Sequence, residues 1–309
     1  MGLMPFINGW ILQIWQYGGS TASEHTLDDA IATALQYGAV GIAPKVLDGL
    51  TWMGHVQRGA PDAPLSVNDV ANHAARCQDA GLMYLPWVNP LHGSREYLNG
   101  QAALYATVGN VAGSLTWDSE PYDQFWGANR PVGDAFAMLE EFRRIAPSCF
   151  NIWQPDPRPG RLAELRPDEW AQHMNAYAPQ SYWSDFGTSA AFEIDRAADQ
   201  AAAFGIAECA PTIPANTDPA NVPAALQRMA ERGVSGCLAW RMGTLTDGHL
   251  GWLRDLAGTG HQPAPPPEPP DACAEIQAEY DHLHAQLEAW RDARPFRAVT
   301  KKKLKALLA

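Results

Sequence analysis

Apolar segments of strand length alternate with helical patterns along most of this chain. Eight short apolar segments recur between residues 10 and 241, and each is followed by apolar residues at helical spacing. The predicted strands cover residues 10–16, 40–45, 82–89, 113–122, 149–154, 176–183, 206–213 and 234–241. The predicted helices cover residues 27–37, 67–77, 96–108, 131–145, a segment starting at 167, 189–204, 219–232 and 249–256. Thr26 and Ser66 occupy N-cap positions of two of these helices.

The regular alternation predicts the fold class. Eight strand–helix units within about 250 residues are typical of a (β/α)8 TIM barrel, so we predict an α/β barrel for residues 1–260. Four glycines separate a predicted helix from the next strand, where C′ glycines are common: Gly38, Gly81, Gly205 and Gly233. A doubly wound open sheet is the alternative. It normally carries a glycine-rich phosphate loop after the first strand, and residues 18–20 (Gly-Gly-Ser) do not form one.

The character of the chain changes beyond Gly260. Residues 261–270 are dominated by proline and predict a stiff linker. Residues 271–309 predict a C-terminal helix with a basic tail. Its apolar positions follow a heptad seam: Cys273, Ile276, Tyr280, Leu283, Leu287 and Trp290. A single helix cannot bury such a stripe alone, so we expect it to form a homo-oligomer, bind a protein partner, or dock on its own barrel. The tail, which holds Lys301, Lys302, Lys303 and Lys305, either docks on a partner or frays.

Composition and charge narrow the range of ligands. Hydrophobic residues make up 46% of the chain and charged residues 18%, which is enough to bury a large core. The formal net charge of −12 argues against nucleic acid as the main ligand. The apolar run at residues 10–15 is too short to span a bilayer. Residues 1–8 lack the charged region of a signal peptide, so we expect any export to use another route.

Several kinds of chemistry have no sequence support. The five cysteines are widely spread without metal-ligand spacing, and we expect them to be buried free thiols. The nine histidines form no H-E-x-x-H or similar cluster, so no metal site is predicted. A G-x-S-x-G elbow for serine hydrolysis is missing as well. We therefore predict no metal and no cofactor.

Polar and aromatic side chains gather at the predicted strand ends. In a barrel, the C-terminal ends of the strands line one open face. The residues expected there are Gln13, Trp15, Lys45, Asp48, Trp87, Asn89, Asp118, Glu120, Gln154, Asp156, Gln180, Tyr182, Trp240 and Arg241. Aromatic faces stack on sugar rings and amides reach hydroxyl groups. This lining therefore predicts a carbohydrate ligand rather than a phosphate or a nicotinamide.

Two carboxylates end the fourth predicted strand. Asp118 and Glu120 are two residues apart, so their side chains point to the same side. Glycoside cleavage needs an acid beside the leaving oxygen, and usually a second carboxylate. We predict Glu120 as the acid, with its pKa raised by the charge of Asp118. Asp48 or Asp156 is expected as the second carboxylate. The alternative for Asp118 and Glu120 is a solvated strand end that caps a loop.

The other candidates also have two interpretations. Lys45 is the only lysine before residue 301. It is expected to pair with Asp118 or contact substrate, to form a Schiff base as in barrel aldolases, or to be a salt-bridged residue at the mouth. Trp15, Trp87 and Trp240 either contact the ligand or pack the top of the core. Gln180 and Tyr182 lie in a stretch too polar for a barrel interior, so we expect them to line the site.

The fourth strand also carries a family resemblance. Trp117-Asp118-Ser119-Glu120 resembles the D-x-E strand of glycoside hydrolases, as in the chitinase-like barrels and the barrel muramidases. Residues 179–183 and Trp240 are similar to the sixth and eighth strands of those barrels. The resemblance covers residues 10–256. It implies that Glu120 is the proton donor, and that Asp118 assists it or orients an acetamido group of the substrate.

The motif departs from the family pattern at several positions. The chitinase pattern D-x-x-D-x-D-x-E has acids where this chain has Gly113 and Thr116. The muramidases have an aspartate on the first strand, where this chain has Gln13 and Trp15. The sixth strand lacks the M-x-Y-D form. The layout of barrel, linker and heptad helix looks like that of barrel domains in phage virion proteins and cell-wall hydrolases.

The sequence therefore predicts one of two functions. The first is a glycosidase that cleaves a cell-wall or surface polysaccharide. The second is a catalytically inactive glycan-binding or structural protein of a phage virion, anchored by its C-terminal helix. Both imply a virion, extracellular or cell-surface location.

Overall fold

The computed structural model describes residues 6–18, 26–123, 125–127 and 129–258. The strands are β1 Gly9–Ile14, β2 Gly41–Asp48, β3 Thr51–Trp52, β4 Met83–Tyr84, β5 Trp87–Asn89, β6 Ser114–Trp117, β7 Phe150–Trp153, β8 Ala176–Tyr177, β9 Glu208–Cys209, β10 Thr212–Pro214 and β11 Gly236–Trp240. The helices are α1 Leu27–Tyr37, α2 Met53–Val56, α3 Val67–Asp79, α4 Arg95–Ala112, α5 Asp134–Ile145, α6 Pro159–Leu165, α7 Pro167–Ala171, α8 Trp183–Phe186, α9 Ala190–Ala203, α10 Val222–Glu231 and α11 Asp247–Gly258. Two 3-10 turns, η1 Pro219–Asn221 and η2 Met242–Thr244, precede α10 and α11.

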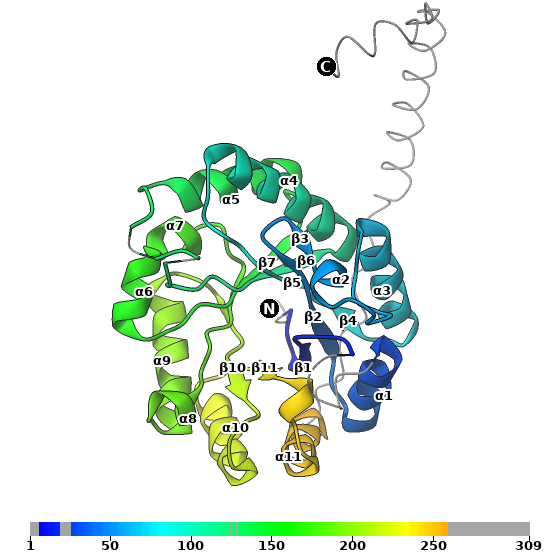
Figure 1. Ribbon diagram of the computed structural model, residues 1–309. Helices are drawn as coiled ribbons and strands as arrows, with labels where there is room; N and C mark the ends of the chain where they lie inside the picture. Colours follow the sequence, from blue (N-terminus) through cyan, green and yellow to red (C-terminus); the bar gives the residue numbers. More distant parts are fainter. Residues whose placement is uncertain (1–5, 19–25, 124, 128, 259–309) are drawn as a thin grey trace, which may run out of the picture. The chain divides into compact units, whose positions relative to one another are not determined.

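The strands form one curled sheet that closes on itself. Its order is β10-β11-β1-β2-β5-β6-β7-β8-β9, and β4 also pairs with β2. β9 and β10 are consecutive segments of one stretch of chain, and they bond to opposite neighbours, β8 and β11. Apart from the short β2–β3 hairpin, the described pairs are parallel. Helices surround this sheet (Figure 1). The parallel curled sheet of a TIM-like barrel is confirmed, and the open doubly wound sheet is wrong.

The local signals that predicted the elements act as expected. The side-chain oxygens of Thr26 and Ser66 accept from the N–H groups of Asp29 and Asp69 at the starts of α1 and α3. Gly38 ends α1 in the left-handed region, with φ of 70°, which a residue without Cβ adopts without strain.

Several boundaries differ from the prediction. The third strand divides into β4 and β5 on either side of Pro86, and the seventh into β9 and β10 on either side of Pro211. Proline lacks the N–H that a strand ladder requires, which explains both interruptions. β6 ends at Trp117, so Asp118 and Glu120 lie just beyond the strand instead of within it. Strand β3 and helices α2, α6 and α8 were not predicted, and the strand predicted at 176–183 is shortened to β8. Helix α5 begins at Asp134 rather than near residue 131.

The core has two layers, which follow from the period of the strands. One cluster, between sheet and helices, includes Trp10, Leu12, Leu115, Trp117 and Trp153. A smaller cluster fills the barrel interior with Ile11, Ala43, Leu85, Trp87, Ile152, Ala176, Ala178, Ala210 and Leu238, among others. Adjacent strand residues therefore face opposite layers.

The chain separates into two units, Met1–Ala264 and Pro265–Ala309. The second unit lies outside the described residues. The predicted linker at 261–270 and the predicted helix at 271–309 also lie outside the described residues, so they stay predictions. Within the described part, no helix is long and apolar enough to cross a bilayer.

Candidate functional site

The alternation of the strands aims a set of polar residues into the barrel. On β1, Trp10 and Leu12 face the helices, which leaves Ile11 and Gln13 facing inward. On β6, Leu115 and Trp117 face the helices, so the next residue, Asp118, turns toward the axis. The same period sends Gln154 inward after Trp153 at the end of β7.

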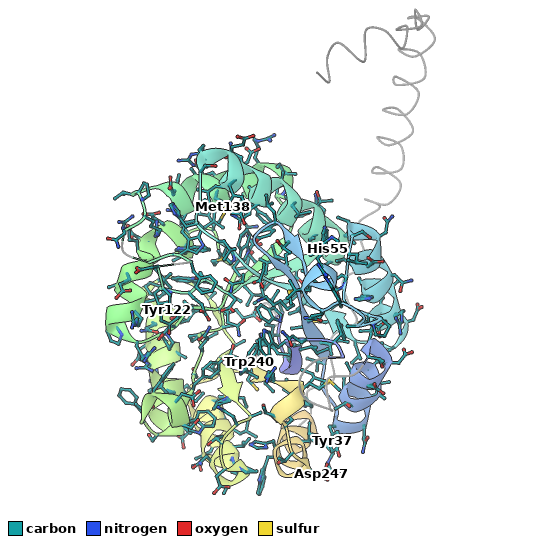
Figure 2. The ribbon with its side chains drawn as sticks, viewed as in Figure 1. Tyr37, His55, Tyr122, Met138, Trp240 and Asp247 are labelled. Carbon is teal, nitrogen blue, oxygen red and sulfur yellow. The ribbon has the colours of Figure 1, made fainter. Side chains whose placement is uncertain are left out.

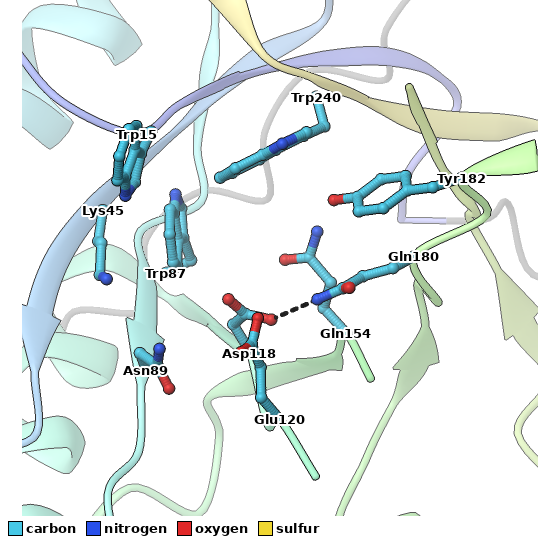
Figure 3. Close-up of a pocket in the computed structure, with 10 residues that line it drawn as sticks. All are labelled: Trp15, Lys45, Trp87, Asn89, Asp118, Glu120, Gln154, Gln180, Tyr182 and Trp240. Atoms are coloured by element: carbon cyan, nitrogen blue, oxygen red, sulfur yellow. Dashed lines mark hydrogen bonds between the residues drawn. The ribbon is translucent and has the colours of Figure 1, made fainter. Parts of the chain in front are cut away.

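These side chains meet in a pocket at the strand ends. The pocket encloses about 320 Å³, at the small end of the usual range for ligand sites. Its lining residues are Trp15, Lys45, Trp87, Asn89, Asp118, Glu120, Gln154, Gln180, Tyr182 and Trp240. In Figure 3 the two carboxylates lie between a group of tryptophan, lysine and asparagine side chains and the facing pair Gln180 and Tyr182. Ten of the residues expected at the strand ends thus line one pocket, whereas Gln13, Asp48, Asp156 and Arg241 are not part of its lining.

A buried amide network forms the floor of this pocket. The carboxamides of Gln13 and Gln154 exchange hydrogen bonds of 3.1 Å. Gln154 Nε2 also donates to Thr212 Oγ1 at 2.9 Å. Because these groups satisfy one another across the barrel, the floor is rigid.

The backbone around the two carboxylates is fixed from three sides. The N–H of Asp118 donates to the carbonyl of Val88 at 2.9 Å, which extends the sheet by one residue. Ser119 points outward, and its Oγ accepts from Trp153 Nε1 at 2.7 Å. The carbonyl of Glu120 accepts from the N–H of Trp126 at 2.9 Å. Asp118 and Glu120 therefore keep the strand-like alternation although β6 has ended.

Burial perturbs both carboxylates. The pKa of Asp118 lies well above the ordinary value, first because the group is desolvated and then because of the charge of Glu120. Desolvation also raises the pKa of Glu120, with smaller contributions from the charges of Asp156 and Asp48. The predicted cause was different. We expected the charge of Asp118 to raise the pKa of Glu120. Burial is instead the main cause of that rise, and the repulsion between the two carboxylates raises the pKa of the deeper Asp118.

Two neutral side chains share the pocket with this pair. Gln180 Nε2 donates to Asp118 Oδ1 at 2.9 Å. The side chain of Gln180 also hydrogen-bonds Glu120, which partly offsets the rise of its pKa. The pKa of Tyr182 is raised well above its usual range by burial and then by the charges of Asp118 and Glu120. Tyr182 therefore stays a phenol that can donate a hydrogen bond into the pocket.

Lys45 does not form the predicted ion pair with Asp118. Its Nζ lies 2.6 Å from Asp48 Oδ1 and 4.9 Å from the centre of the Trp87 ring. The register between β2 and β5 is irregular between Lys45 and Leu47, and this irregularity puts Asp48 beside Lys45 rather than in the pocket lining. The charge of Lys45 nevertheless lowers the pKa of Asp118 and of Glu120. Its Nζ therefore acts on the two acids through space.

Asp156, the other candidate for a second carboxylate, also has a partner of its own. Its Oδ2 accepts from Arg158 Nη2 at 2.5 Å, and its Oδ1 accepts from Arg158 Nε at 3.0 Å. Asp48 and Asp156 are thus each bound to a cation. Asp118 and Glu120 are the only carboxylates among the pocket-lining residues that the structure describes.

Asn89 is the lining residue with an unused hydrogen-bonding group. Its side chain is only 6% exposed, and within the described residues its Oδ1 has no hydrogen-bond partner. A buried carbonyl without a donor costs about 1–3 kcal/mol. A ligand group that donates to Asn89 would recover this free energy.

The tryptophans have mixed roles. Trp87 is almost fully buried, belongs to the interior cluster, and donates from Nε1 to the carbonyl of Ile14 at 3.0 Å. Trp15 and Trp240 are half-buried at the mouth. The guanidinium of Arg241 lies 4.4 Å from the centre of the Trp15 ring, which fixes one face of that ring.

Residues 6–258, without the gaps given above, hold no group of three or more His, Cys, Asp or Glu side chains that could bind a metal. Cys77, Cys149 and Cys237 are buried free thiols and Cys209 is half-buried, whereas Cys273 lies outside the described residues. Desolvation raises the pKa of these four described thiols to about 12. None of the four is therefore a reactive thiolate at neutral pH.

Sequence reasoning missed a group of residues beside the pocket. Tyr122, Arg158 and Phe186 form a chain of contacts that continues from Tyr182. Each follows a predicted site residue by two to four positions. Tyr122 and Arg158 lie in loops and Phe186 ends the four-residue helix α8, so the strand pattern could not place them.

Comparisons with known proteins identify the fold. No protein-family model matches the sequence, and no curated protein matches it significantly. Among solved structures, the C-terminal domain of a putative chitinase from Desulfitobacterium hafniense DCB-2 superposes with a TM-score of 0.56 at 12% identity, over 83% of this chain and 100% of that chain. A xylanase and alpha-amylase inhibitor protein from Scadoxus multiflorus gives 0.57 at 13% identity, over 82% of this chain and 99% of that chain. The spore cortex-lytic enzyme SleL from Bacillus cereus gives 0.57 at 10% identity, over 81% of this chain and 74% of that chain. The structural relatives are thus chitinase-like and other glycoside hydrolase barrels, and at this identity they establish the barrel fold.

Proposed function

We propose that this barrel binds a neutral cell-wall or surface polysaccharide and cleaves it with Glu120 as the general acid. The observation that carries the proposal is the pocket itself. The buried carboxylate of Asp118 and the half-buried carboxylate of Glu120 share it with tryptophan, tyrosine and amide side chains. The names of several structural relatives, a putative chitinase and a cortex-lytic enzyme among them, agree with a glycan substrate.

Glu120 has the properties of a general acid. Desolvation raises its pKa, so the carboxylic acid persists to higher pH than that of an exposed glutamate. Glu120 is half-buried, whereas Asp118 is 8% exposed, so Glu120 is the more accessible of the two to a glycosidic oxygen. Asp118, held by Gln180, lies beneath it.

The placement of the carboxylates favours one type of mechanism. Glycosidases with a protein nucleophile or base need a second carboxylate on the opposite side of the sugar. Asp48 and Asp156 are engaged with Lys45 and Arg158, and Asp118 follows the same strand end as Glu120. Some glycosidases instead use a group of the substrate as the nucleophile. We therefore assign that role to a 2-acetamido carbonyl of the sugar, with Asp118 orienting the acetamido group.

The rest of the lining suits a neutral sugar. Trp15, Trp240 and Tyr182 offer aromatic surface, while Asn89 and Gln180 offer amide groups. The free carbonyl of Asn89 accepts from a hydroxyl or N–H of the ligand. The carboxylates would repel an anionic sugar, because the pocket lining contains a single cation, Lys45, among the described residues.

The test is cleavage by a Glu120→Gln variant. Oligosaccharides of N-acetylglucosamine and purified peptidoglycan would serve as substrates, with release of reducing ends as the readout. We expect the variant to lose at least about a hundredfold in kcat while it retains binding, because the amide keeps the shape and removes the proton. Glu141→Gln is the matched control, since Glu141 lies in an exposed pair with Arg144 on α5. Full activity of the Glu120 variant would disprove the mechanism.

A second candidate function is glycan binding without cleavage. It is favoured by the pairing of Asp48 and Asp156, which leaves no carboxylate described on the far side of the pocket. The same fold occurs in an inhibitor protein and in a chitinase-like lectin from tamarind. In this form the protein would be a phage virion or cell-surface component, with residues 271–309 as its oligomer anchor. Binding on a glycan array without release of reducing ends would support it.

The anchor can be tested separately. Light scattering on the full chain and on a chain shortened to Gly260 would measure both masses. We expect an oligomer from the full chain and a monomer from the shortened one. Two monomers would rule out self-association through 271–309.

A further inference from the structure

An aromatic and arginine-lined rim extends from one side of the pocket. The Tyr182 ring is 6.0 Å from the ring of Phe186 on α8. The guanidinium of Arg158 lies 4.6 Å from the centre of the Phe186 ring and hydrogen-bonds Tyr122. Arg161 on α6 lies 5.2 Å from the centre of the Tyr122 ring. We call Tyr122, Arg158, Arg161 and Phe186 the rim cluster.

The rim cluster is built from the loops that supply the pocket. The loop after β6 carries Glu120 and, two residues later, Tyr122. The loop after β7 carries Gln154 and then Arg158, and the segment after β8 carries Tyr182 and then Phe186. In each of these three adjacent segments, a residue that lines the pocket is followed by a residue of the rim cluster. In Figure 2 Tyr122 lies toward α6, whereas Trp240 lies nearer the barrel centre. The rim therefore continues the pocket outward.

The side chains of the rim cluster are partly exposed to solvent, so they do not serve only to pack the core. Tyr122 is 36% exposed, and the side chains of Arg158 and Arg161 are 39% and 43% exposed. Arg158 is held by Asp156, which keeps the guanidinium against the Phe186 ring. The rings are thus held in place while part of their surface faces solvent, an arrangement typical of a binding platform.

The charges of the rim cluster indicate the kind of ligand. Arg158 pairs with Asp156 at 2.5 Å, and Arg161 pairs with Glu164 at 3.4 Å. Each cation therefore has its own counter-charge, so the rim has no net attraction for a polyanion. A flat apolar surface bordered by hydrogen-bond donors matches the face of a neutral pyranose ring.

We propose that the rim cluster is a second sugar subsite, which binds a further unit of the same polysaccharide that enters the pocket. This inference rests on the proposed function. The pocket of about 320 Å³ accommodates a short stretch of glycan, and the rim adds contacts that only a longer chain can reach. Tyr122 stacks on the sugar ring, and Arg158 and Arg161 donate to its hydroxyl groups. The subsite makes binding depend on chain length.

The test compares short and long ligands. Isothermal titration calorimetry would measure a disaccharide and a hexasaccharide of N-acetylglucosamine on the full-length Glu120→Gln protein, which prevents cleavage. When Tyr122→Ala is added, the Kd for the hexasaccharide should rise about threefold to tenfold, because stacking on one sugar ring contributes to that extent. The Kd for the disaccharide should not change. Tyr122→Phe should restore hexasaccharide binding. Trp252→Ala is the control, since Trp252 is an aromatic residue on α11 that is 43% exposed away from the mouth.

The outcomes separate the two proposals. An equal effect of Tyr122→Ala on both ligands, or no effect on either, would overturn the subsite and leave the pocket assignment standing. A loss of the same size in Trp252→Ala would also overturn it, because the effect would not be local. If neither oligosaccharide binds the parent protein, the proposed function fails, and the subsite fails with it.

Discussion

A buried ion pair holds the loop that carries Glu120. Arg130, at the end of this loop, donates from Nη1 to Glu169 Oε2 on α7 at 2.9 Å, and its side chain is 1% exposed. Glu169 Oε1 accepts from the N–H of Gly133 at 3.1 Å. The loop is thus joined to α7 at the point where α5 begins. We predict that Arg130→Met destabilises the protein and displaces Glu120.

The size of the effect follows from the partners that remain. Removal of one member of a buried pair typically costs about 3–5 kcal/mol, because the other charge stays buried without compensation. Glu169 keeps the Gly133 N–H and has Arg166 at 3.8 Å, so we expect the lower end, about 3 kcal/mol. For a domain of this size, that corresponds to a fall of about 6–12 °C in the melting temperature. Arg130→Met with Glu169→Met should recover part of the loss, because the uncompensated charge of Glu169 is gone. The recovery is partial because the Gly133 N–H loses its acceptor, the Leu165 carbonyl loses the Arg130 donor, and Arg166 loses its ion-pair partner at 3.8 Å.

Urea denaturation would measure the free energies of unfolding of the parent, of Arg130→Met, of the double variant with Glu169→Met, and of a control variant, Glu141→Gln. Glu141→Gln provides the comparison, since breaking an exposed pair such as Glu141–Arg144 costs about 0–1 kcal/mol. A loss in Arg130→Met no larger than this control would refute the reasoning. So would a double variant that is less stable than Arg130→Met. In the activity assay, we expect Arg130→Met to lower kcat with little change in KM, because Glu120 moves while the pocket walls stay in place.

Two further predictions concern the titrating groups of the pocket. Burial raises the pKa of Asp118, so the folded protein favours the neutral acid, and ionisation costs stability as the pH rises from the ordinary value near 3.9 through the folded pKa. Asp118→Asn should therefore raise the melting temperature at pH 7 and leave it unchanged at pH 3, and a gain at both pH values would contradict this account. Lys45 lowers the pKa of Glu120, and Asp48 raises it. In profiles of kcat/KM against pH, Lys45→Met should move the alkaline limb to higher pH, and Asp48→Asn should move it to lower pH. A shift of both variants in the same direction would refute Glu120 as the titrating acid.

The sequence predicts the fold well because the barrel depends on periods of two and of 3.6 residues. The inward position of Gln13 and the outward position of Trp10 follow from the period of β1 alone. Boundaries are less predictable where proline interrupts a strand. Pro86 and Pro211 lie inside runs that have strand composition, and only the bonds to neighbouring strands show how each run divides.

The site is predictable only as far as the strand pleat extends. Asp118 and Glu120 keep the alternation of β6, so their common direction could be read from their spacing. Asp48 could not be placed, because the irregular register after Lys45 changes the direction of the chain. Arg158 and Tyr122 come from loops whose course depends on contacts between distant segments. Their pairing with Asp156 and Arg161 has no signature in the local sequence.

The distribution of charge partners in the pocket restricts the chemistry further. Asp48 and Asp156 each have a cation within 2.6 Å, whereas Asp118 accepts from the neutral amide of Gln180 and forms no ion pair within the described part of the chain. Desolvating a carboxylate without a cation costs stability, and groups perturbed in this way are candidates for function. Asp118 and Glu120 adjoin at one strand end, and desolvation raises the pKa of both. Burial also raises the pKa of Glu208, but that carboxylate accepts from the backbone N–H groups of Phe6 and Ile7 and so has a structural role. The arrangement therefore favours a proton-donating role over a purely binding one, because a sugar can be bound by amides and rings without two desolvated acids.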